Sequence, residues 1–391
     1  MESPWIAPLL AVLLVSGLTA CGKKENTGQP ATESNVIKIG SAAPLTGPQA
    51  HLGKDNENGT RMAIDDANLK GIEIGGKKVT FELVSEDDQA DPKTATIIAQ
   101  KLVDAKVNGV IGHLNSGTTI PASRIYNEAG IVQISPSATN PKYTEQGFKS
   151  AFRVMTNDVQ QGKVLGEYAV KQLGAKKIAI IDDRSAYGQG LADQFEKAAK
   201  AAGGEIVAHE FTTDKSTDFM AILTSVKAKA PDLVFYGGMD AQGGPMIKQL
   251  RSLGLTAKFL TGDGGSTPEF IKLSGGAAEG AYSSLPGVPL AVMPGGKAFA
   301  EKFIAKYGQI QLYAPYCYDA VNVMIAAMQK AGSADPAKYL PELAKIELEG
   351  VTAQIKFDEK GDIRGGAVTL YQVKNGKWEV LETVTASPAA K

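Results

Sequence analysis

Cysteine, histidine and tryptophan are scarce in this sequence: its 391 residues include two cysteines, three histidines and two tryptophans. So few thiol and imidazole side chains argue against a metal site built from them. Charge of one sign is not in excess either, since 41 lysines and arginines stand against 42 aspartates and glutamates, for a formal net charge of −1. With no basic block, the sequence also lacks the electrostatic footprint of a nucleic-acid-binding protein.

Long hydrophobic runs are missing too. The apolar segment at residues 6–15 is shorter than the roughly 20 residues that span a membrane, but it has the length of the central region of a secretory signal peptide. The following Leu18-Thr19-Ala20-Cys21 resembles the lipobox of bacterial lipoproteins, whose cysteine is acylated and becomes the first residue of the mature protein. We therefore predict a lipoprotein-type signal peptide over residues 1–20 and lipid attachment at Cys21. Because residues 1–4 lack lysine and arginine, a plain cleaved signal is the alternative.

The segment after the signal peptide is polar. Residues 21–35 contain no aromatic residue and show no apolar periodicity, which predicts a flexible tether. Lipid attachment at Cys21 leaves Cys317 without a partner for an internal disulfide. Because Cys317 lies in an apolar, helix-like segment, YAPYCYDAVNVMIAAMQKA, we predict a buried thiol that acts as a small hydrophobic side chain.

From residue 36 onward, short β-branched runs alternate with longer amphipathic ones. Strands are expected at 37–40, 79–84, 109–114, 131–135, 177–182, 205–211, 232–236 and 258–261, with helices between them that include 121–129, 190–202, 217–229 and 243–253. This alternation is typical of right-handed βαβ units and of parallel sheets covered on both faces. We predict two lobes: residues 36–157 with about 287–352, and residues 158–286 with about 353–385.

Ligands of parallel α/β sheets bind at the carboxyl ends of the strands, so the loops at those ends carry the functional argument. These loops are polar or glycine-rich, and none contains a catalytic cluster. Ser116 lacks the G-x-S-x-G surroundings of a hydrolase nucleophile, and His113 has no partner that would complete a triad. Gly188-x-Gly190 is only a fragment of a dinucleotide-binding motif. We predict neither an enzyme nor a cofactor.

The loop NSGTT, residues 115–119, follows a predicted strand and precedes Pro121, which is expected at or near the first position of a helix. Free N–H groups and the positive end of the helix dipole point back at such a loop. The hydroxyls of Ser116 and of Thr118 or Thr119 add donors, so the loop suits a carboxylate or a phosphate. Ordinary capping of the helix by Thr119 is the alternative.

Two other loops supply acceptors. The loop SPSATNP, residues 135–141, offers the Ala138 carbonyl and the Thr139 hydroxyl to an ammonium group, and Asp263 in GDGGST supplies the charge that neutralises it. Tyr187 in SAYGQG is placed to lie over a ligand. The alternatives are that Asp263 only serves a turn and that Tyr187 only packs at the edge of the cleft.

The motifs IGHLNSGTTIPAS, VQISPSATNPKYT, IAIIDDRSAYGQGLAD and DLVFYGGMDAQG resemble those of the branched-chain amino-acid binding proteins of bacterial ABC transporters, a group of type I periplasmic binding proteins. The resemblance extends over about residues 37–384. It implies two doubly wound parallel-sheet lobes joined by a three-segment hinge, with a ligand cleft between them. It also implies capture of a small molecule, an amino acid, in the periplasm or cell envelope. The protein then acts as a monomer that delivers this ligand, chemically unchanged, to permease and ATPase subunits in the membrane.

The same resemblance assigns the binding residues. The contacts to the ligand's carboxylate, to its ammonium and to its upper face are implied for Ser116, Ser137, Ala138, Thr139, Asp263 and Tyr187. Asp263 stands where known leucine-binding members have glutamate, and it serves the ammonium together with Thr139 and the Ala138 carbonyl. Tyr187 matches the tyrosine that closes over the ligand.

The side-chain pocket departs from the family pattern. Leu52 stands where an aromatic residue is common, Met239 stands where a tyrosine is common, and Asn115 replaces a cysteine that is disulfide-bonded in some members. Asn115 and Asp240 add polarity. We expect leucine, isoleucine or valine as the ligand, with a larger or more polar amino acid as an open alternative. The alternative function is a module that senses another amino acid, an amide or a small carboxylate and signals to a partner.

Overall fold

The computed structural model describes residues 35–385. The predicted signal peptide, the acylation of Cys21 and nearly all of the predicted tether fall outside these residues. Among the residues that are described, no helix is both long enough and apolar enough to cross a membrane.

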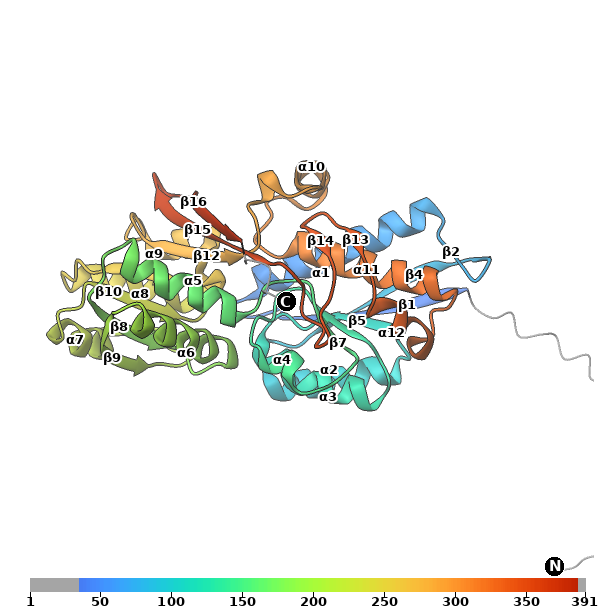
Figure 1. The fold of residues 1–391 in the computed structure, drawn as a ribbon, viewed down its shortest axis with the longest axis horizontal. Coiled ribbons are helices and arrows are strands. Elements are labelled where there is room, and N and C mark those ends of the chain that lie inside the picture. The colour runs from blue at the N-terminus through green and yellow to red at the C-terminus, as the bar shows by residue number, and fades with distance from the viewer. Residues whose placement is uncertain (1–34, 386–391) are drawn as a thin grey trace, which may run out of the picture. The chain divides into compact units, whose positions relative to one another are not determined.

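The first lobe is built on a five-stranded parallel sheet with the order β4-β1-β5-β6-β7. Its strands are β1 (Val36–Ala43), β4 (Thr80–Asp87), β5 (Gly109–Gly112), β6 (Gln133–Ser135) and β7 (Ala151–Arg153). One face is covered by α2 (Pro92–Asp104) and α3 (Ser116–Glu128), and the other by α1 (Ala50–Lys70) and α11 (Ala314–Ala331) (Figure 1). The small elements of this lobe are β2 (Glu73–Ile74), β3 (Lys77–Lys78) and α4 (Lys142–Glu145).

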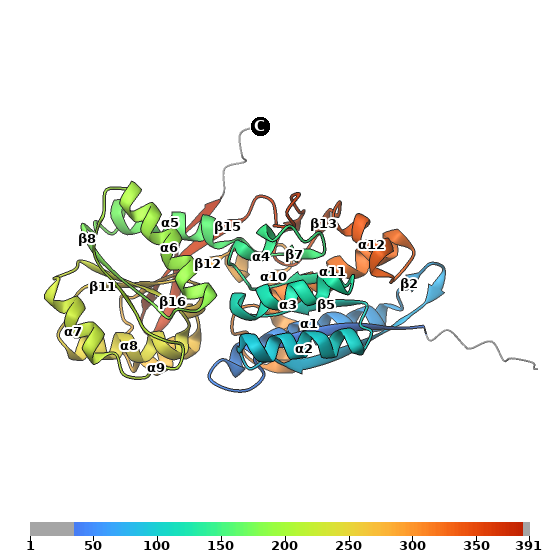
Figure 2. The same cartoon turned by 90° about the horizontal axis from the view of Figure 1, so that it is seen from below.

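The second lobe is built on a seven-stranded sheet with the order β16-β15-β12-β11-β10-β8-β9, in which β15 and β16 run antiparallel to their neighbours. Its strands are β8 (Lys177–Asp182), β9 (Glu205–Phe211), β10 (Leu233–Gly237), β11 (Lys258–Thr261), β12 (Tyr282–Pro286), β15 (Ala367–Lys374) and β16 (Lys377–Thr385). One face carries α5 (Asp158–Lys171) and α6 (Ala186–Ala201), and the other carries α7 (Met220–Ala228), α8 (Asp240–Ser252) and α9 (Pro268–Ser274) (Figure 2).

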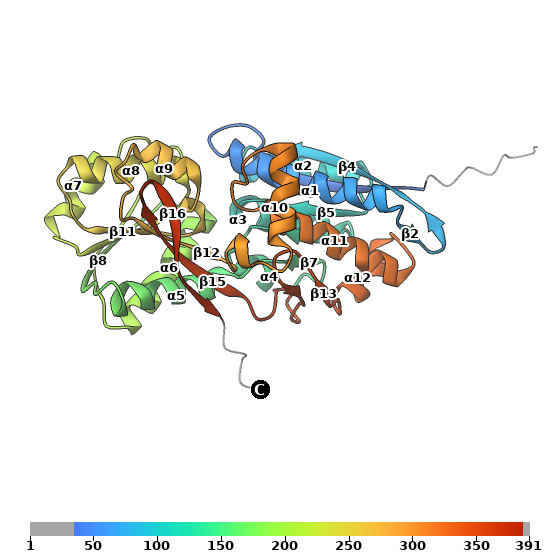
Figure 3. The same cartoon turned by 90° about the horizontal axis from the view of Figure 1, so that it is seen from above.

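The chain passes between the two sheets three times. It leaves the first sheet after β7, and it returns after β12 to form η2 (Leu290–Val292), α10 (Gly296–Tyr307), α11, α12 (Pro336–Leu343), β13 (Leu348–Glu349) and β14 (Gln354–Ile355). It then goes back to the β15–β16 hairpin at the edge of the second sheet (Figure 3). One parallel and one mostly parallel sheet, each with helices on both faces, confirm the predicted α/β architecture of two lobes.

The central strands are apolar over most of their length because both of their faces are covered. In β8 every residue after Lys177 is buried. Phe235 of β10 stacks on Phe195 of α6, with the ring centroids 3.9 Å apart. Most of α11 is buried too, and it contains Cys317, whose thiol is unpaired and fully buried. The prediction of a buried Cys317 is confirmed.

Three helices begin earlier than the sequence predicts. α3 begins at Ser116 and not near Pro121, α6 begins at Ala186, and α8 begins at Asp240. Glycines and prolines near these starts suggested loops, but the first four N–H groups of a helix need no acceptor within it. The acceptors that start two of these helices come from just outside them: the Asn115 carbonyl accepts from the N–H groups of Thr118 and Thr119, and the Ser185 hydroxyl accepts from Gly188. Segment 115–119 is therefore mostly a helix start and not a loop.

Candidate functional site

A small cavity lies where strand ends of the two lobes meet. It is lined by Leu114, Asn115, Ser116, Ser137, Tyr187, Met239, Asp263 and Tyr313. Six of the predicted binding residues are thus brought together, whereas Leu52, Ala138, Thr139 and Asp240 are not part of the lining. The volume of this cavity, counted as the space open to the centre of a water molecule, is only about 10 Å³. That is room for one water. An amino acid therefore fits only after the lobes or their side chains have moved apart.

Asp263 is the charged group of the cavity. It begins the short η1 (Asp263–Gly265) after β11, and it is 1% exposed. Its Oδ1 accepts from Gln161 Nε2 at 3.0 Å and from the Tyr187 hydroxyl at 2.8 Å, and its Oδ2 accepts from the Tyr313 hydroxyl at 2.7 Å. Burial raises the pKa of Asp263, and these three hydrogen bonds oppose that change. Because all three donors are neutral, none of them balances the negative charge of the carboxylate.

The start of α3 lines the same cavity from the first lobe. Ser116 and Gly117 are its first two residues, so their backbone N–H groups have no acceptor within the helix and lie at the positive end of its dipole. The Ser116 Oγ accepts from the backbone N–H of Asn140 at 3.2 Å, which leaves the hydroxyl proton available. The helix start can therefore donate several hydrogen bonds to an anionic group.

The loop at residues 135–141 lies beside this helix start. The Ser137 hydroxyl lines the cavity and donates to the Leu114 carbonyl at 3.0 Å. The Ala138 carbonyl, predicted to meet an ammonium, accepts instead from Nη1 of Arg153 at 2.8 Å. Thr139 is fully buried next to this bond. The ligand contacts of Ala138 and Thr139 stay predictions.

Arg153 holds this loop in place, and sequence reasoning did not find it. Its guanidinium is fully buried at the end of β7. Besides Ala138 it donates to the Asn140 carbonyl at 2.9 Å, to the Thr144 hydroxyl at 3.0 Å and to Asp362 at 2.6 Å. Asp362 lies in the last segment that passes between the sheets, so Arg153 ties that segment to the loop. The signal in the sequence that could have identified Arg153 is its position as a single arginine in an apolar run.

Asp158 is a second buried carboxyl near the cavity. It is the first residue of α5, and burial together with the negative charge of Asp263 raises its pKa to about 8, although Thr139 and Arg153 act in the opposite direction. The raised pKa favours the protonated, neutral form of Asp158. As a neutral group it does not compete with Asp263 for a cation.

Leu52 and Asp240 lie around the cavity and not in its wall. Leu52 is fully buried and belongs to a hydrophobic core cluster that includes residues of both lobes. Asp240 is the first residue of α8, and its Oδ2 accepts from His51 Nε2 at 2.7 Å and from the Thr267 hydroxyl at 2.5 Å. Since His51 belongs to α1, the His51–Asp240 pair joins a helix of one lobe to a helix of the other.

The His51–Asp240 pair makes the joined arrangement of the lobes sensitive to pH. Burial alone would lower the pKa of His51, but the hydrogen bond to Asp240 and the negative charges of Asp240, Glu269 and Asp55 raise it above its ordinary value of 6.5. The raised pKa means that the pair stabilises this arrangement fully below pH 6.5 and that the contribution is lost as the pH rises through the raised pKa. We expect His51→Gln to remove on the order of 1 kcal/mol of stability at low pH and nothing at high pH.

This expectation is checked by comparing the melting temperatures of the wild type and His51→Gln between pH 5.5 and 9. The difference between them should shrink as the pH rises. The pKa of His209 is raised as well, first by Asp182 and then by Glu196. Both of these partners belong to the same lobe as His209. His209→Gln is therefore the matched control: it removes a histidine with a raised pKa that does not join the two lobes. A His51→Gln difference that is independent of pH would contradict the assignment.

His113 is engaged at both ring nitrogens. Its Nδ1 lies 2.7 Å from Oδ2 of Asp88, and its Nε2 lies 3.0 Å from the Tyr126 hydroxyl. The imidazole therefore has no ring nitrogen left to activate Ser116. Among residues 35–385, no group of three or more His, Cys, Asp or Glu side chains is arranged to hold a metal ion.

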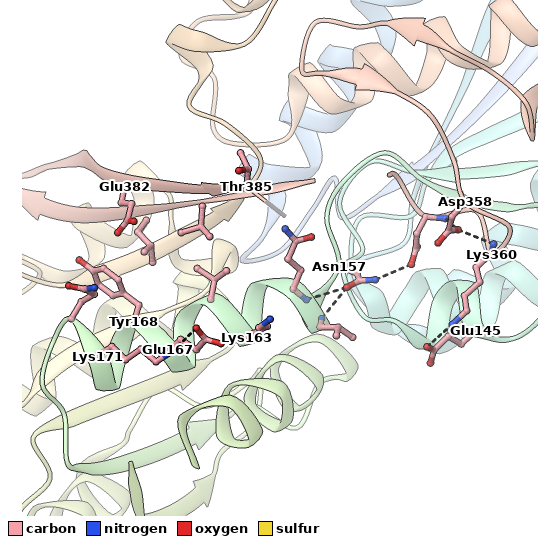
Figure 4. Close-up of a pocket in the computed structure, with 17 residues that line it drawn as sticks. Glu145, Asn157, Lys163, Glu167, Tyr168, Lys171, Asp358, Lys360, Glu382 and Thr385 are labelled. Carbon is pink, nitrogen blue, oxygen red and sulfur yellow. Dashed lines mark hydrogen bonds and ion pairs between the residues drawn. The ribbon is translucent and has the colours of Figure 1, made fainter. Parts of the chain in front are cut away.

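A larger cavity, of about 740 Å³, lies beside α5 and the end of β16 (Figure 4). Its rim carries ion pairs that are already formed between exposed side chains, Lys171–Glu167 at 3.0 Å and Lys360–Glu145 at 3.4 Å. Exposed pairs of this kind offer a ligand little free energy. The cavity also lacks a buried charge like that of Asp263, so the smaller cavity is the better candidate site.

Known proteins are similar to this chain in sequence and in fold. A family model described as a periplasmic binding protein matches residues 36–377. The "Amino acid binding protein" of Pseudomonas aeruginosa is 38% identical over 349 residues, 88% of this chain and 92% of that protein. The "Leu/Ile/Val-binding protein homolog 1" of Brucella suis is 36% identical over 88% of this chain and 90% of its own length. The solved structure of the branched-chain amino acid transporter substrate binding protein LivJ from Streptococcus pneumoniae, in complex with isoleucine, has a TM-score of 0.82 and 30% identity, and the match covers 90% of this chain and 100% of that one.

Proposed function

Because the chain belongs to the periplasmic binding protein family, we propose that it is the extracytoplasmic solute-binding component of an ABC importer and that its ligand is a free L-α-amino acid. Leucine, isoleucine and valine are the expected ligands, since a relative with 36% identity is named for them and LivJ holds isoleucine. The protein delivers its ligand to the permease and ATPase subunits. Acylated Cys21 anchors it to the membrane that contains them.

One observation carries this proposal: a buried carboxylate and a helix start share one cavity, and each comes from a different lobe. The ligand's ammonium pairs with Asp263 of the second lobe. Its carboxylate accepts from the N–H groups of Ser116 and Gly117 and from the Ser116 hydroxyl in the first lobe. Both charges of the ligand lose their water when the site shuts, so each needs its own partner.

Binding requires the lobes to separate and close again. The hydrogen bonds that hold them together around the cavity include three made by side chains. They join the Tyr313 hydroxyl to Asp263 at 2.7 Å, Asn140 Nδ2 to the Ala186 carbonyl at 2.5 Å, and His51 to Asp240 at 2.7 Å. These bonds break when the site opens and re-form around the ligand. The ligand is released unchanged, because the site binds it and has no nucleophile paired with a base.

The proposal is tested by a thermal-shift panel of the twenty amino acids with small amides and short peptides. A ligand at 100 times its Kd adds about 2.7 kcal/mol to the free energy of unfolding, and we expect the largest shifts among amino acids of branched-chain size. Asp263→Asn should lose the shift while its own melting temperature shows that it is folded. The absence of a shift with every α-amino acid would contradict the proposal, and a shift with an amide alone would favour the sensing module.

A further inference from the structure

The carboxamide of Asn115 is not used in the way that its position suggests. Asn115 directly precedes α3, where an asparagine side chain ordinarily accepts a hydrogen bond from the helix. Here the side chain makes no capping bond, and its Nδ2 donates to Oε1 of Gln49 at 2.7 Å. Gln49 directly precedes α1 and does not cap its helix either. The side chains of the two residues that precede these helices thus bond to each other and do not cap their own helices.

The other end of the Asn115 carboxamide has no hydrogen-bond partner among residues 35–385. Asn115 lines the cavity, and its Oδ1 is buried without a hydrogen bond. A buried carbonyl oxygen that lacks a donor is unfavourable. A donor from a molecule bound in the cavity would satisfy this oxygen.

A second unpaired acceptor lies in the same neighbourhood. Asp240 follows Met239, which lines the cavity, and it is fully buried. Its Oδ2 is engaged with His51 and Thr267, whereas its Oδ1 has no hydrogen-bond partner in the described part of the chain. His51 is two residues from Gln49, so both unpaired oxygens are linked to the start of α1. Because His51 faces Asp240, a protonated His51 balances the charge of that carboxylate.

We propose that Asn115 is a specificity-determining residue, and that its Oδ1 selects an amino acid whose side chain carries a neutral hydrogen-bond donor, a hydroxyl or a carboxamide. This proposal rests on the proposed function, because it places the ligand's ammonium at Asp263 and directs its side chain to Asn115. It refines the expected ligands: between two side chains of one shape, the donor-bearing one binds more tightly. Threonine therefore binds more tightly than valine, and asparagine more tightly than leucine.

The proposal is tested by calorimetric titration of the wild type with threonine, valine, asparagine and leucine. These ligands form two pairs of similar shape, threonine with valine and asparagine with leucine. In whichever pair binds more tightly, the member that carries the donor should have a Kd lower by about tenfold or more, because a site built to bond a donor rejects the analogue that lacks it. Asn115→Leu keeps the approximate size, removes the acceptor and should abolish or reverse this preference. Asn58→Leu, a partly exposed asparagine of α1, is the matched control and should leave the ratio unchanged.

Gln49→Met is the second variant, and it keeps the test decisive if Asn115→Leu does not fold. It releases the Asn115 carboxamide, so the preference should fall while the cavity wall stays intact. Equal or tighter binding of the aliphatic member in the wild type overturns the proposal and leaves the proposed function standing. The proposal is likewise overturned, with the proposed function left standing, if Asn115→Leu still prefers the donor-bearing ligand or if lysine is the tightest ligand. If no α-amino acid binds, the proposed function fails and this proposal fails with it.

Discussion

Replacing Asp263 by alanine is expected to weaken the binding of the best amino-acid ligand by about 2–5 kcal/mol, or roughly 30- to 5,000-fold in Kd. The reason is that the ligand's ammonium is buried when the lobes close, and Asp263 is the only acidic residue among those that line the cavity. The Tyr187 and Tyr313 hydroxyls that now donate to Asp263 offer an ammonium far less than a carboxylate does. Calorimetric titration of the wild type and the variant with the same ligand measures the effect.

Two further variants show which part of the site causes this effect. Ser116→Ala should cost less affinity than Asp263→Ala, because the backbone N–H groups at the start of α3 remain. Asp263→Asn removes the charge and keeps the shape. Since burial raises the pKa of Asp263 above its ordinary value of 3.8, the ionised group destabilises the ligand-free protein at neutral pH, and the melting temperature of Asp263→Asn should not fall. Wild-type affinity in Asp263→Ala would show that the ammonium binds elsewhere.

Arg153→Met is expected to lower the free energy of unfolding by about 3–5 kcal/mol. The fully buried guanidinium donates to the carbonyls of Ala138 and Asn140 and to the Asp362 carboxylate. Methionine fills part of the volume but removes the hydrogen bonds that Arg153 donates to the two carbonyls and the cation that pairs with Asp362. The effect is measured by denaturant unfolding. Because the loop at 135–141 loses its anchor, the affinity for the ligand should fall as well.

The size of this loss depends on the buried charge that is left behind. Asp362 keeps the bond from Asn157 Nδ2 at 2.9 Å but has no cation after the substitution of Arg153. The double variant Arg153→Met with Asp362→Leu should therefore recover part of the lost stability. Arg61→Met is the matched control, because Arg61 pairs with Glu57 on the surface of α1. It is expected to lower the free energy of unfolding by about 0.5 kcal/mol or less. Equal effects of Arg153→Met and Arg61→Met would contradict the role of Arg153.

The fold was readable from the sequence because its signals are local. Short apolar runs such as β8 and β10 alternate with amphipathic helices, and this alternation alone predicts parallel sheets. The helix starts were not readable in the same way. At Ser116, Ala186 and Asp240 the helices begin on residues that favour turns, and only the acceptors supplied from outside the helix, such as the Asn115 carbonyl, determine where each begins.

The candidate site was predictable where it depends on single loops and not where it depends on contacts between distant segments. Ser116, Ser137 and Asp263 follow predicted strands, and the cavity brings them together. The bonds of Gln161 and Tyr313 to Asp263 join residues that are 102 and 50 positions apart, and no spacing pattern announces them. Likewise, whether a residue such as Leu52 faces the cavity or the core depends on the exact tilt of a helix, which periodicity does not give.

The most direct test of the central claim compares the best-binding L-amino acid with two of its derivatives by calorimetric titration. The N-acetyl derivative lacks the ammonium that Asp263 is proposed to bind, and the carboxamide lacks the carboxylate that the start of α3 is proposed to bind. Each is expected to bind at least about 30-fold more weakly than the free amino acid, because the loss of one charged partner at a buried site costs about 2 kcal/mol or more of binding free energy. If either derivative binds as tightly as the free amino acid, the cavity between Ser116 and Asp263 does not recognise the ligand as a zwitterion, and the account is contradicted.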